Sequence, residues 1–187
     1  IMDNLITETE KFVVQLLNDK LDNKFVYHNL AHTQRVVEKT IELAELAKIN
    51  EPDKTHLLLS AWLHDTGYTE KIENHEDESS IIASTFLSEQ GLPKNEIDIV
   101  CNLILATKIN NEPKTQLEKI IRDADCAHIG NKNYLDISEL LRKEWELTSD
   151  KTLSESDWLA ENINFLSTKH RFYTNEASSI WDKGKGK

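Results

Sequence analysis

The stretch from Leu57 to Gly67, LLLSAWLHDTG, constrains the fold more than any other part of this chain. Almost every side chain from Leu57 to Leu63 is apolar, so a helix through this run has no polar face to turn toward water and other elements must enclose it. The run ends on the adjacent pair His64-Asp65, and Gly67 can then adopt the left-handed conformation that ends a helix. The stretch therefore predicts a central helix with an ionisable pair at its buried end.

Burying such a pair is costly, because each buried polar group without a partner costs roughly 2–7 kcal/mol. A divalent metal ion satisfies an imidazole and a carboxylate together. A capping aspartate beside a core histidine explains the same dipeptide equally well. The pair His64-Asp65 alone favours neither interpretation.

Glycine and proline are scarce in the 187-residue chain, with 5 Gly and 3 Pro, which indicates few hairpin turns and favours long helices joined by short loops. A hydrophobic content of 39% at this length suffices for one sizeable core and is small for two. We predict an all-α, compact single-domain helical bundle over residues 1–182. Residues 183–187 are expected to form a frayed basic tail.

The net charge is -11, from 22 Lys+Arg against 33 Asp+Glu, and the tail holds the only basic block, which argues against a groove for polymeric nucleic acid. No run of about 18 apolar residues indicates a membrane span, and the first helix is amphipathic and acidic rather than signal-like. Cys101 and Cys126 lack ligand spacing and are expected to be reduced. We expect a soluble, cytoplasmic protein whose amphipathic ends are compatible with a homo-oligomer.

Other predicted helices also carry ionisable residues at their interior edges. His32 shares a helical line with Val36, and His75 begins the buried stripe of a helix that ends near Gln90. Asp123 and Asp125 flank an apolar face about equally, so periodicity does not choose between them. The candidate site gathers side chains from four or five helices: His28, His32, His64, Asp65, His75 and one of Asp123 or Asp125.

Histidine and carboxylate ligands without thiolate suit Mn, Fe, Co, Ni or Zn, or Mg where histidines are fewer, and they indicate a catalytic rather than a structural Cys-based site. Such a metal can bind a phosphoryl oxygen and activate a water molecule. Taken singly, His32 or His75 is more typical of a hydrogen-bonded core histidine. Lys108 could hold a phosphate, although a lysine in a last helical turn also complements the helix dipole. His28 could be a ligand, a proton donor or a packing residue.

The order His32, His64-Asp65, Asp125 resembles the HD-domain superfamily of metal-dependent phosphohydrolases, all-helical proteins that act on phosphate esters, often of nucleotides. His32 stands in HTQRVV and Asp125 in RDADCAHIG, two contexts similar to the family's first and last ligand segments over residues 27–130. The resemblance implies metal ligands at His32, His64, Asp65 and Asp125. It also implies that Asp65 holds a nucleophilic water.

The segment YHNLAH is similar to a stretch of cyclic-nucleotide phosphodiesterases in which the histidine matching His28 is the proton donor, which suggests His28 as a general acid. Family members that use a glutamate three residues after the HD pair have no counterpart here, since that position is Tyr68. Histidines for a second metal are represented at most by His75. His75 and Lys108 therefore stand as candidates for a second metal or a phosphate contact.

The resemblance implies a metal-dependent phosphohydrolase that cleaves a phosphomonoester or phosphodiester of a nucleotide or similar small molecule. The expected cofactor is a divalent ion: Mn, Mg, Co, Ni, Fe or Zn. Two alternatives stay open. One is a cyclic (di)nucleotide phosphodiesterase, favoured by YHNLAH, and the other is a non-catalytic sensor module that binds a metal or a nucleotide.

Overall fold

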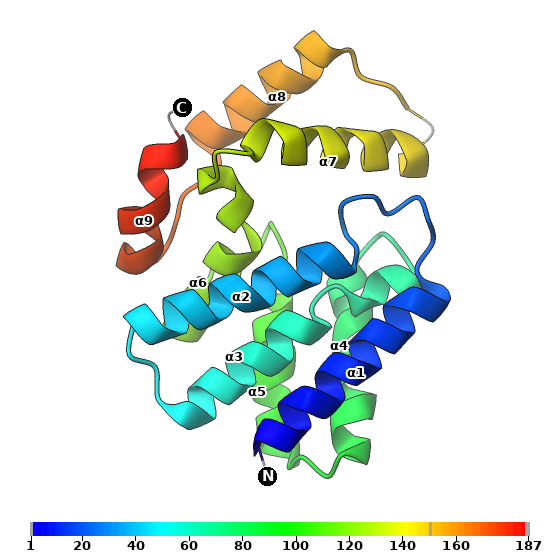
Figure 1. The fold of residues 1–187 in the computed structure, drawn as a ribbon, viewed down its shortest axis with the longest axis vertical. Helices are drawn as coiled ribbons and strands as arrows, with labels where there is room; N and C mark the ends of the chain where they lie inside the picture. The colour runs from blue at the N-terminus through cyan, green and yellow to red at the C-terminus, as the bar shows by residue number, and fades with distance from the viewer. Residues whose placement is uncertain (1, 150, 186–187) are drawn as a thin grey trace.

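The computed structural model describes residues 2–149 and 151–185, and all regular elements in these ranges are helices, which confirms the all-α prediction (Figure 1). No described helix combines the length and the apolar character needed to cross a membrane. The α-helices are α1 (Met2–Lys20), α2 (Leu30–Leu46), α3 (Glu51–Leu63), α4 (His75–Glu89), α5 (Lys94–Leu105), α6 (Gln116–Asp125), α7 (Tyr134–Ser149), α8 (Glu155–Thr168) and α9 (Asn175–Lys185). Two short 3-10 helices, η1 (Thr66–Thr69) and η2 (Ala127–Gly130), follow α3 and α6.

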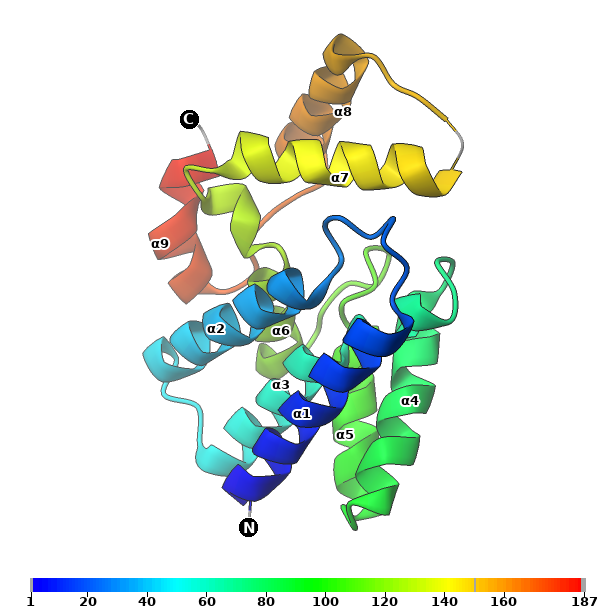
Figure 2. The same ribbon diagram turned by 45° about the vertical axis from the view of Figure 1, so that its right-hand side comes forward.

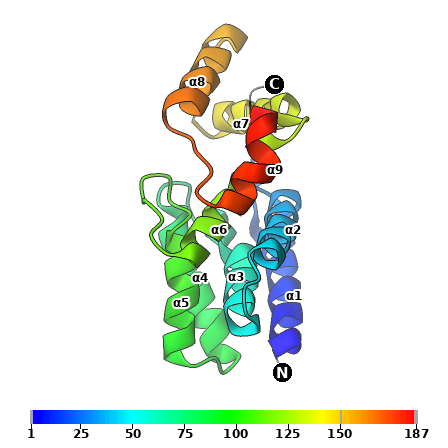
Figure 3. The ribbon, with the colours of Figure 1, turned by 90° about the vertical axis from the view of Figure 1, so that its left-hand side faces the viewer.

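Helix α3 is the central helix that the apolar run predicts. Every residue from Thr55 to Leu63 is buried, and α1, α2, α5 and α6 all pack against the helix. Figure 3 shows α3 between α1 and α2 on one side and α4 and α5 on the other. Asn50 starts α3 by accepting a hydrogen bond from the Asp53 N–H, so the N-terminal end of this apolar helix is capped by a side chain.

The last three α-helices lie at one end of this bundle. Figure 2 shows α7 crossing above the start of α2, with α8 beyond it and α9 on the left-hand side. Helix α8 has no buried residue, whereas α9 packs against η2 and buries Ala177 and Trp181. The C-terminal helices therefore rest on the end of the bundle at which α3 stops.

The expected frayed tail is wrong for residues 183–185, because α9 continues to Lys185. A Cβ atom at Gly184 would lie 2.1 Å from the carbonyl oxygen of Gly130, so the helix and η2 meet backbone to backbone. This contact holds the C-terminal turn of α9 against the bundle. Residues 186–187 lie outside the described part of the chain.

Gly67 has a different role from the predicted left-handed helix end. The one described glycine with a positive φ is Gly91, at 81°, while Gly67 lies within η1. A Cβ atom at Gly67 would lie 1.9 Å from the carbonyl oxygen of His75, and the Gly67 N–H donates to Ser79 Oγ at 2.8 Å. The glycine is thus required for close approach, and it brings the end of α3 into contact with the start of α4.

We predict that Gly67→Ala lowers the free energy of unfolding by about 3 kcal/mol or more, because the new methyl group overlaps backbone atoms that cannot move independently. Gly91→Ala is the matched control. It meets no atom within 4 Å and should cost only the about 1–2 kcal/mol of a left-handed alanine. Urea unfolding of metal-free protein measures both values. Equal losses in the two variants would contradict the close-approach role of Gly67.

Candidate metal centre

The predicted pair lies at the C-terminal end of α3, in the interior. His64 is completely buried, and its Nδ1 donates a hydrogen bond to the carbonyl oxygen of Ala61 at 2.8 Å. That bond fixes the tautomer and leaves Nε2 free to act as a ligand. His64 Nε2 and Asp65 Oδ2 are buried atoms without a hydrogen-bond partner among the described residues. Two orphaned acceptor atoms at one buried point fit a shared cation.

His32 and Asp125 approach this pair from two other helices. His32 lies in the first turn of α2, which Asn29 caps by accepting hydrogen bonds from the N–H groups of Ala31 and His32. His32 Nε2 is 3.1 Å from Asp125 Oδ1 and 3.3 Å from Asp65 Oδ2. His64 Nε2 is 3.4 Å from Asp125 Oδ1. The structure thus brings together the four residues that the resemblance implies as metal ligands.

The donor set fits a divalent cation. Ligand atoms of His32, His64 and Asp125 all lie within 4.8 Å of one another, and Asp65 Oδ2 adds a second carboxylate 3.2 Å from His64 Nε2. Two imidazole nitrogens and two carboxylates suit Mn, Fe, Co, Ni or Zn and leave coordination positions for water or substrate.

Charges in the cluster perturb one another strongly. Burial lowers the pKa of His32 and of His64, but the adjacent Asp65 and Asp125 outweigh it and raise both values above the usual histidine range. Burial alone would raise the pKa of Asp65, yet His64 and His32 hold it well below its usual range. The pKa values of the two histidines and of Asp65 are therefore set mainly by the charges inside the cluster, against the effect of burial.

His75 joins the cluster from the start of α4. Its Nε2 is 3.3 Å from Asp65 Oδ1, the carboxylate oxygen that faces away from His64. The ring stacks on Tyr68 with 3.8 Å between centroids. His75 thus stands next to the metal candidates on one side of Asp65.

Asp123 and Lys108 do not join the cluster. Asp123 is 1% exposed and accepts three hydrogen bonds from the segment before α9: two at 2.8 Å from the N–H groups of Tyr173 and Thr174, and one at 2.7 Å from the Thr174 hydroxyl. Lys108 lies beyond the end of α5 and forms an ion pair with Asp77 at 2.7 Å. Of the two aspartates that periodicity left open, the structure places Asp125 in the cluster.

His28 lies beside the cluster and is held by a residue that sequence reasoning missed. Glu144 of α7 is 6% exposed, and its Oε1 accepts hydrogen bonds from the N–H groups of Tyr27 at 3.0 Å and His28 at 2.8 Å. Its Oε2 accepts from His28 Nδ1. The sequence feature that could have indicated Glu144 is a glutamate on the buried side of an amphipathic helix. Its partner His28 lies 116 residues away, so no local pattern connects the two.

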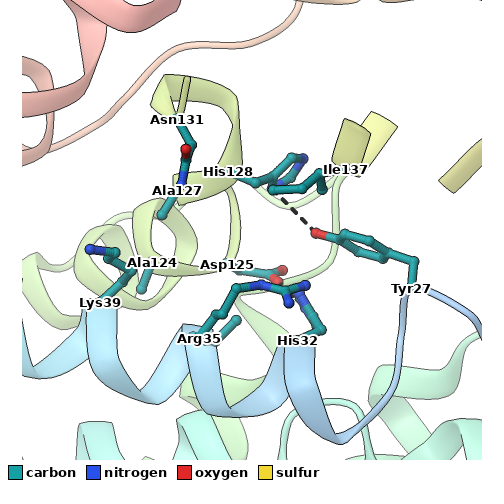
Figure 4. A pocket seen from close by; sticks show the side chains of 11 residues that line it. Tyr27, His32, Arg35, Lys39, Ala124, Asp125, Ala127, His128, Asn131 and Ile137 are labelled. Carbon is teal, nitrogen blue, oxygen red and sulfur yellow. Dashed lines mark hydrogen bonds and ion pairs between the residues drawn. The ribbon is translucent and has the colours of Figure 1, made fainter. Parts of the chain in front are cut away.

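A small pocket of about 30 Å³ opens beside His32 and Asp125, and Arg35 and Lys39 line it from α2 (Figure 4). The Arg35 guanidinium lies 6.0 Å from the centre of the Tyr27 ring. Arg35 places positive charge beside the cluster in a protein of net charge -11, whereas Lys39 forms an ion pair with Glu42 at 2.8 Å. Sequence reasoning did not assign Arg35 or Lys39 to the site.

His128 faces Arg35 and Lys39 across this pocket, and its Nδ1 is 3.2 Å from the Tyr27 hydroxyl (Figure 4). Burial lowers the pKa of His128 to about 3, so its imidazole is neutral near pH 7. The positive charge of the pocket therefore comes chiefly from Arg35 of α2.

The HD domain profile matches residues 29–130, more than half of the chain. No curated protein and no solved structure matches the sequence significantly. The matched range contains the four residues that the resemblance implies as ligands, and His75 as well, while Glu144 lies beyond it. Proteins with this domain are generally metal-dependent hydrolases, and the His and Asp cluster is compatible with that chemistry. The chain belongs to the HD domain family.

Proposed function

We propose that this protein is a metal-dependent phosphohydrolase that cleaves a phosphomonoester or phosphodiester of a nucleotide or similar small molecule. One observation carries the proposal: imidazoles and carboxylates from α2, α3 and α6 converge on a buried point where His64 Nε2 and Asp65 Oδ2 have no described hydrogen-bond partner. Membership of the HD domain family supports the same chemistry.

His32, His64, Asp65 and Asp125 would hold the metal ion. When bound, a divalent ion polarises a phosphoryl oxygen and lowers the pKa of a coordinated water. Asp65 would orient the attacking water. Its carboxylate lies between two groups, with one oxygen facing His64 and the other facing His75, so it spans the side of the cluster from which a water would attack. His75 would contact a substrate phosphate oxygen or a second cation from that side.

His28 would protonate the leaving oxygen. Its Nδ1 is engaged by Glu144, so Nε2 is the ring atom left to donate a proton. Its ring lies 5.5 Å from that of His32 and 4.7 Å from that of Tyr68, measured between centroids. The pairing of His28 with Glu144 also favours the second candidate, a cyclic-nucleotide phosphodiesterase. The alkoxide that leaves a phosphodiester needs a proton, and His28 could donate it.

Two aspartates that lie two positions apart test the ligand assignment. We expect Asp125→Ala to lose stoichiometric Mn²⁺ binding and at least about 100-fold in hydrolysis of a panel of nucleotides, cyclic nucleotides and simple phosphoesters. Asp123→Ala should keep both properties but lose about 2–3 kcal/mol of stability, because three donors lose their acceptor. Calorimetric titration, the hydrolysis panel and urea unfolding give the three values.

Three outcomes would contradict parts of this assignment. Metal binding retained by Asp125→Ala would remove Asp125 from the ligand set. Loss of metal binding in a folded Asp123→Ala variant would show that Asp123 belongs to the site, contrary to this assignment. A metal-loaded wild type inert toward the whole panel would contradict the phosphohydrolase and favour a metal-binding sensor.

Metal affinity should rise with pH. The pKa values of His32, His64 and His75 are raised above the ordinary 6.5, so these imidazoles still hold protons at pH values where free histidine has lost them. A metal binds only the free base, so binding releases protons and tightens as pH increases through the raised pKa values. Mn²⁺ titrations at pH 6.5, 7.5 and 8.5, in buffers of different ionisation enthalpy, measure both effects. Constant affinity without proton release would be inconsistent with histidine ligands.

Glu144→Gln tests the general acid, since glutamine keeps an acceptor for the Tyr27 and His28 N–H groups but removes the carboxylate from His28 Nδ1. We expect kcat to fall about 10- to 100-fold for esters with an alkoxide leaving group. With p-nitrophenyl phosphate, whose leaving group needs no proton, the loss should be within about threefold. Equal losses for both esters would show that Glu144 acts only on the structure.

A further inference from the structure

A second cavity, of about 350 Å³, lies beneath α7 and α8 on the His28 side of the cluster. His28 and Tyr68 form the part of its wall that adjoins the cluster, and Tyr68 is the residue stacked on His75. A molecule in this cavity would therefore meet the proposed proton donor and the ring that supports His75. We call it the α7–α8 pocket.

The walls of the α7–α8 pocket are mainly aromatic. Phe25 comes from the loop between α1 and α2, Tyr68 comes from η1, and Tyr134, Trp145, Trp158 and Phe165 come from α7 and α8. Rings of this kind present flat apolar faces, which bind other flat rings by stacking. Because α7 and α8 lie outside the range matched by the HD domain, this half of the pocket belongs to the C-terminal helices.

Polar groups in the lining are already paired with each other. Asn162 accepts from the Tyr134 hydroxyl at 3.3 Å and donates to Ser138 Oγ at 2.7 Å, while Trp158 Nε1 donates to the same Ser138 oxygen at 3.0 Å. Glu144 is the one carboxylate among the described lining residues, and His28 and two backbone N–H groups occupy it. The α7–α8 pocket therefore offers stacking surface without an unpaired charge.

We propose that the α7–α8 pocket binds the neutral, flat ring system of the substrate whose phosphate lies at the metal cluster. This rests on the proposed function. The substrate class is then a phosphate ester of an alcohol that carries one nucleobase-sized ring system, such as a nucleoside monophosphate. A volume of 350 Å³ is at the small end of ligand pockets, which fits one such ring system and opposes a dinucleotide.

The first test measures binding without hydrolysis. Saturation-transfer NMR with adenosine, guanosine, cytidine and uridine as probes should show stronger transfer to base protons than to ribose protons for at least one nucleoside. Trp158→Ala should remove this signal, whereas Ile163→Ala should keep it, because Ile163 lies on the same helix but is 66% exposed and faces a different cavity. Should Trp158→Ala fail to fold, Thr148→Phe, which fills the pocket from α7, replaces it.

The second test is kinetic and compares nucleoside 5′-monophosphates with ribose 5-phosphate. In Trp158→Ala, kcat/KM for the preferred nucleotide should fall roughly 10- to 100-fold, mainly through KM, while the value for ribose 5-phosphate stays within about threefold of wild type. The pocket assignment would be overturned if kcat/KM of the wild type for ribose 5-phosphate equalled or exceeded its kcat/KM for every nucleotide. Equal effects of Trp158→Ala and Ile163→Ala would also overturn it.

The two tests separate this inference from the proposed function. Base-directed nucleoside binding that is lost in Trp158→Ala supports the pocket even if no phosphoester is hydrolysed, in which case the phosphohydrolase fails alone. Metal-dependent hydrolysis without base-directed binding keeps the phosphohydrolase and overturns the pocket.

Discussion

Burial of the His64-Asp65 pair is the constraint on which the rest of this structure depends. The apolar helix α3 has to be enclosed on all sides, and enclosing it carries an imidazole and a carboxylate out of water. The cost is offset only where other ionisable groups meet the pair, and His32, Asp125 and His75 do so from α2, α6 and α4. Core packing and site assembly are therefore linked, since α2 and α6, which pack against α3, also deliver His32 and Asp125.

Two further buried carboxylates tie the C-terminal helices to this centre. Asp123 binds the segment before α9 through three hydrogen bonds, although it lies on the same helix as Asp125. Glu144 reaches in the other direction, from α7 to the residues just before α2. Each buried carboxylate is stabilised by hydrogen bonds from residues that are distant in the sequence. Displacing α7 or α9 would therefore leave a buried acid without partners. The placement of these helices is thereby linked to the site.

Local patterns were sufficient to predict α3 and to place His32 and the His64-Asp65 pair at interior helix positions, because each lies on an apolar helical stripe or at its end. They could not choose between Asp123 and Asp125, since both flank the same stripe and the partner of Asp123, Thr174, is 51 residues away. Gly67 was predicted to end a helix in the left-handed conformation, whereas its role is a close approach between η1 and α4. A close approach of this kind leaves no local pattern in the sequence. Glu144 was missed for the same reason, because the groups that its carboxylate binds, at Tyr27 and His28, lie in a distant loop. Lys108 was placed on a helical stripe, but α5 ends at Leu105 and the lysine pairs with Asp77.

The distribution of charge around the cluster argues for a substrate with one anionic end and one neutral end. A protein of net charge -11 repels an anion at long range, so recognition has to be local. Positive charge is available beside His32 and Asp125, where Arg35 lines the small pocket, and a bound cation would add to it. On the His28 side the lining is aromatic and its polar atoms are paired, so a phosphate placed there would lose hydration without gaining a counter-charge. In the proposed binding mode, a phosphate ester with its ring system toward α7 and α8 would present its scissile bond between His28 and the proposed metal ligands. Desolvation alone would then orient the substrate, before any specific hydrogen bond to the ring is made.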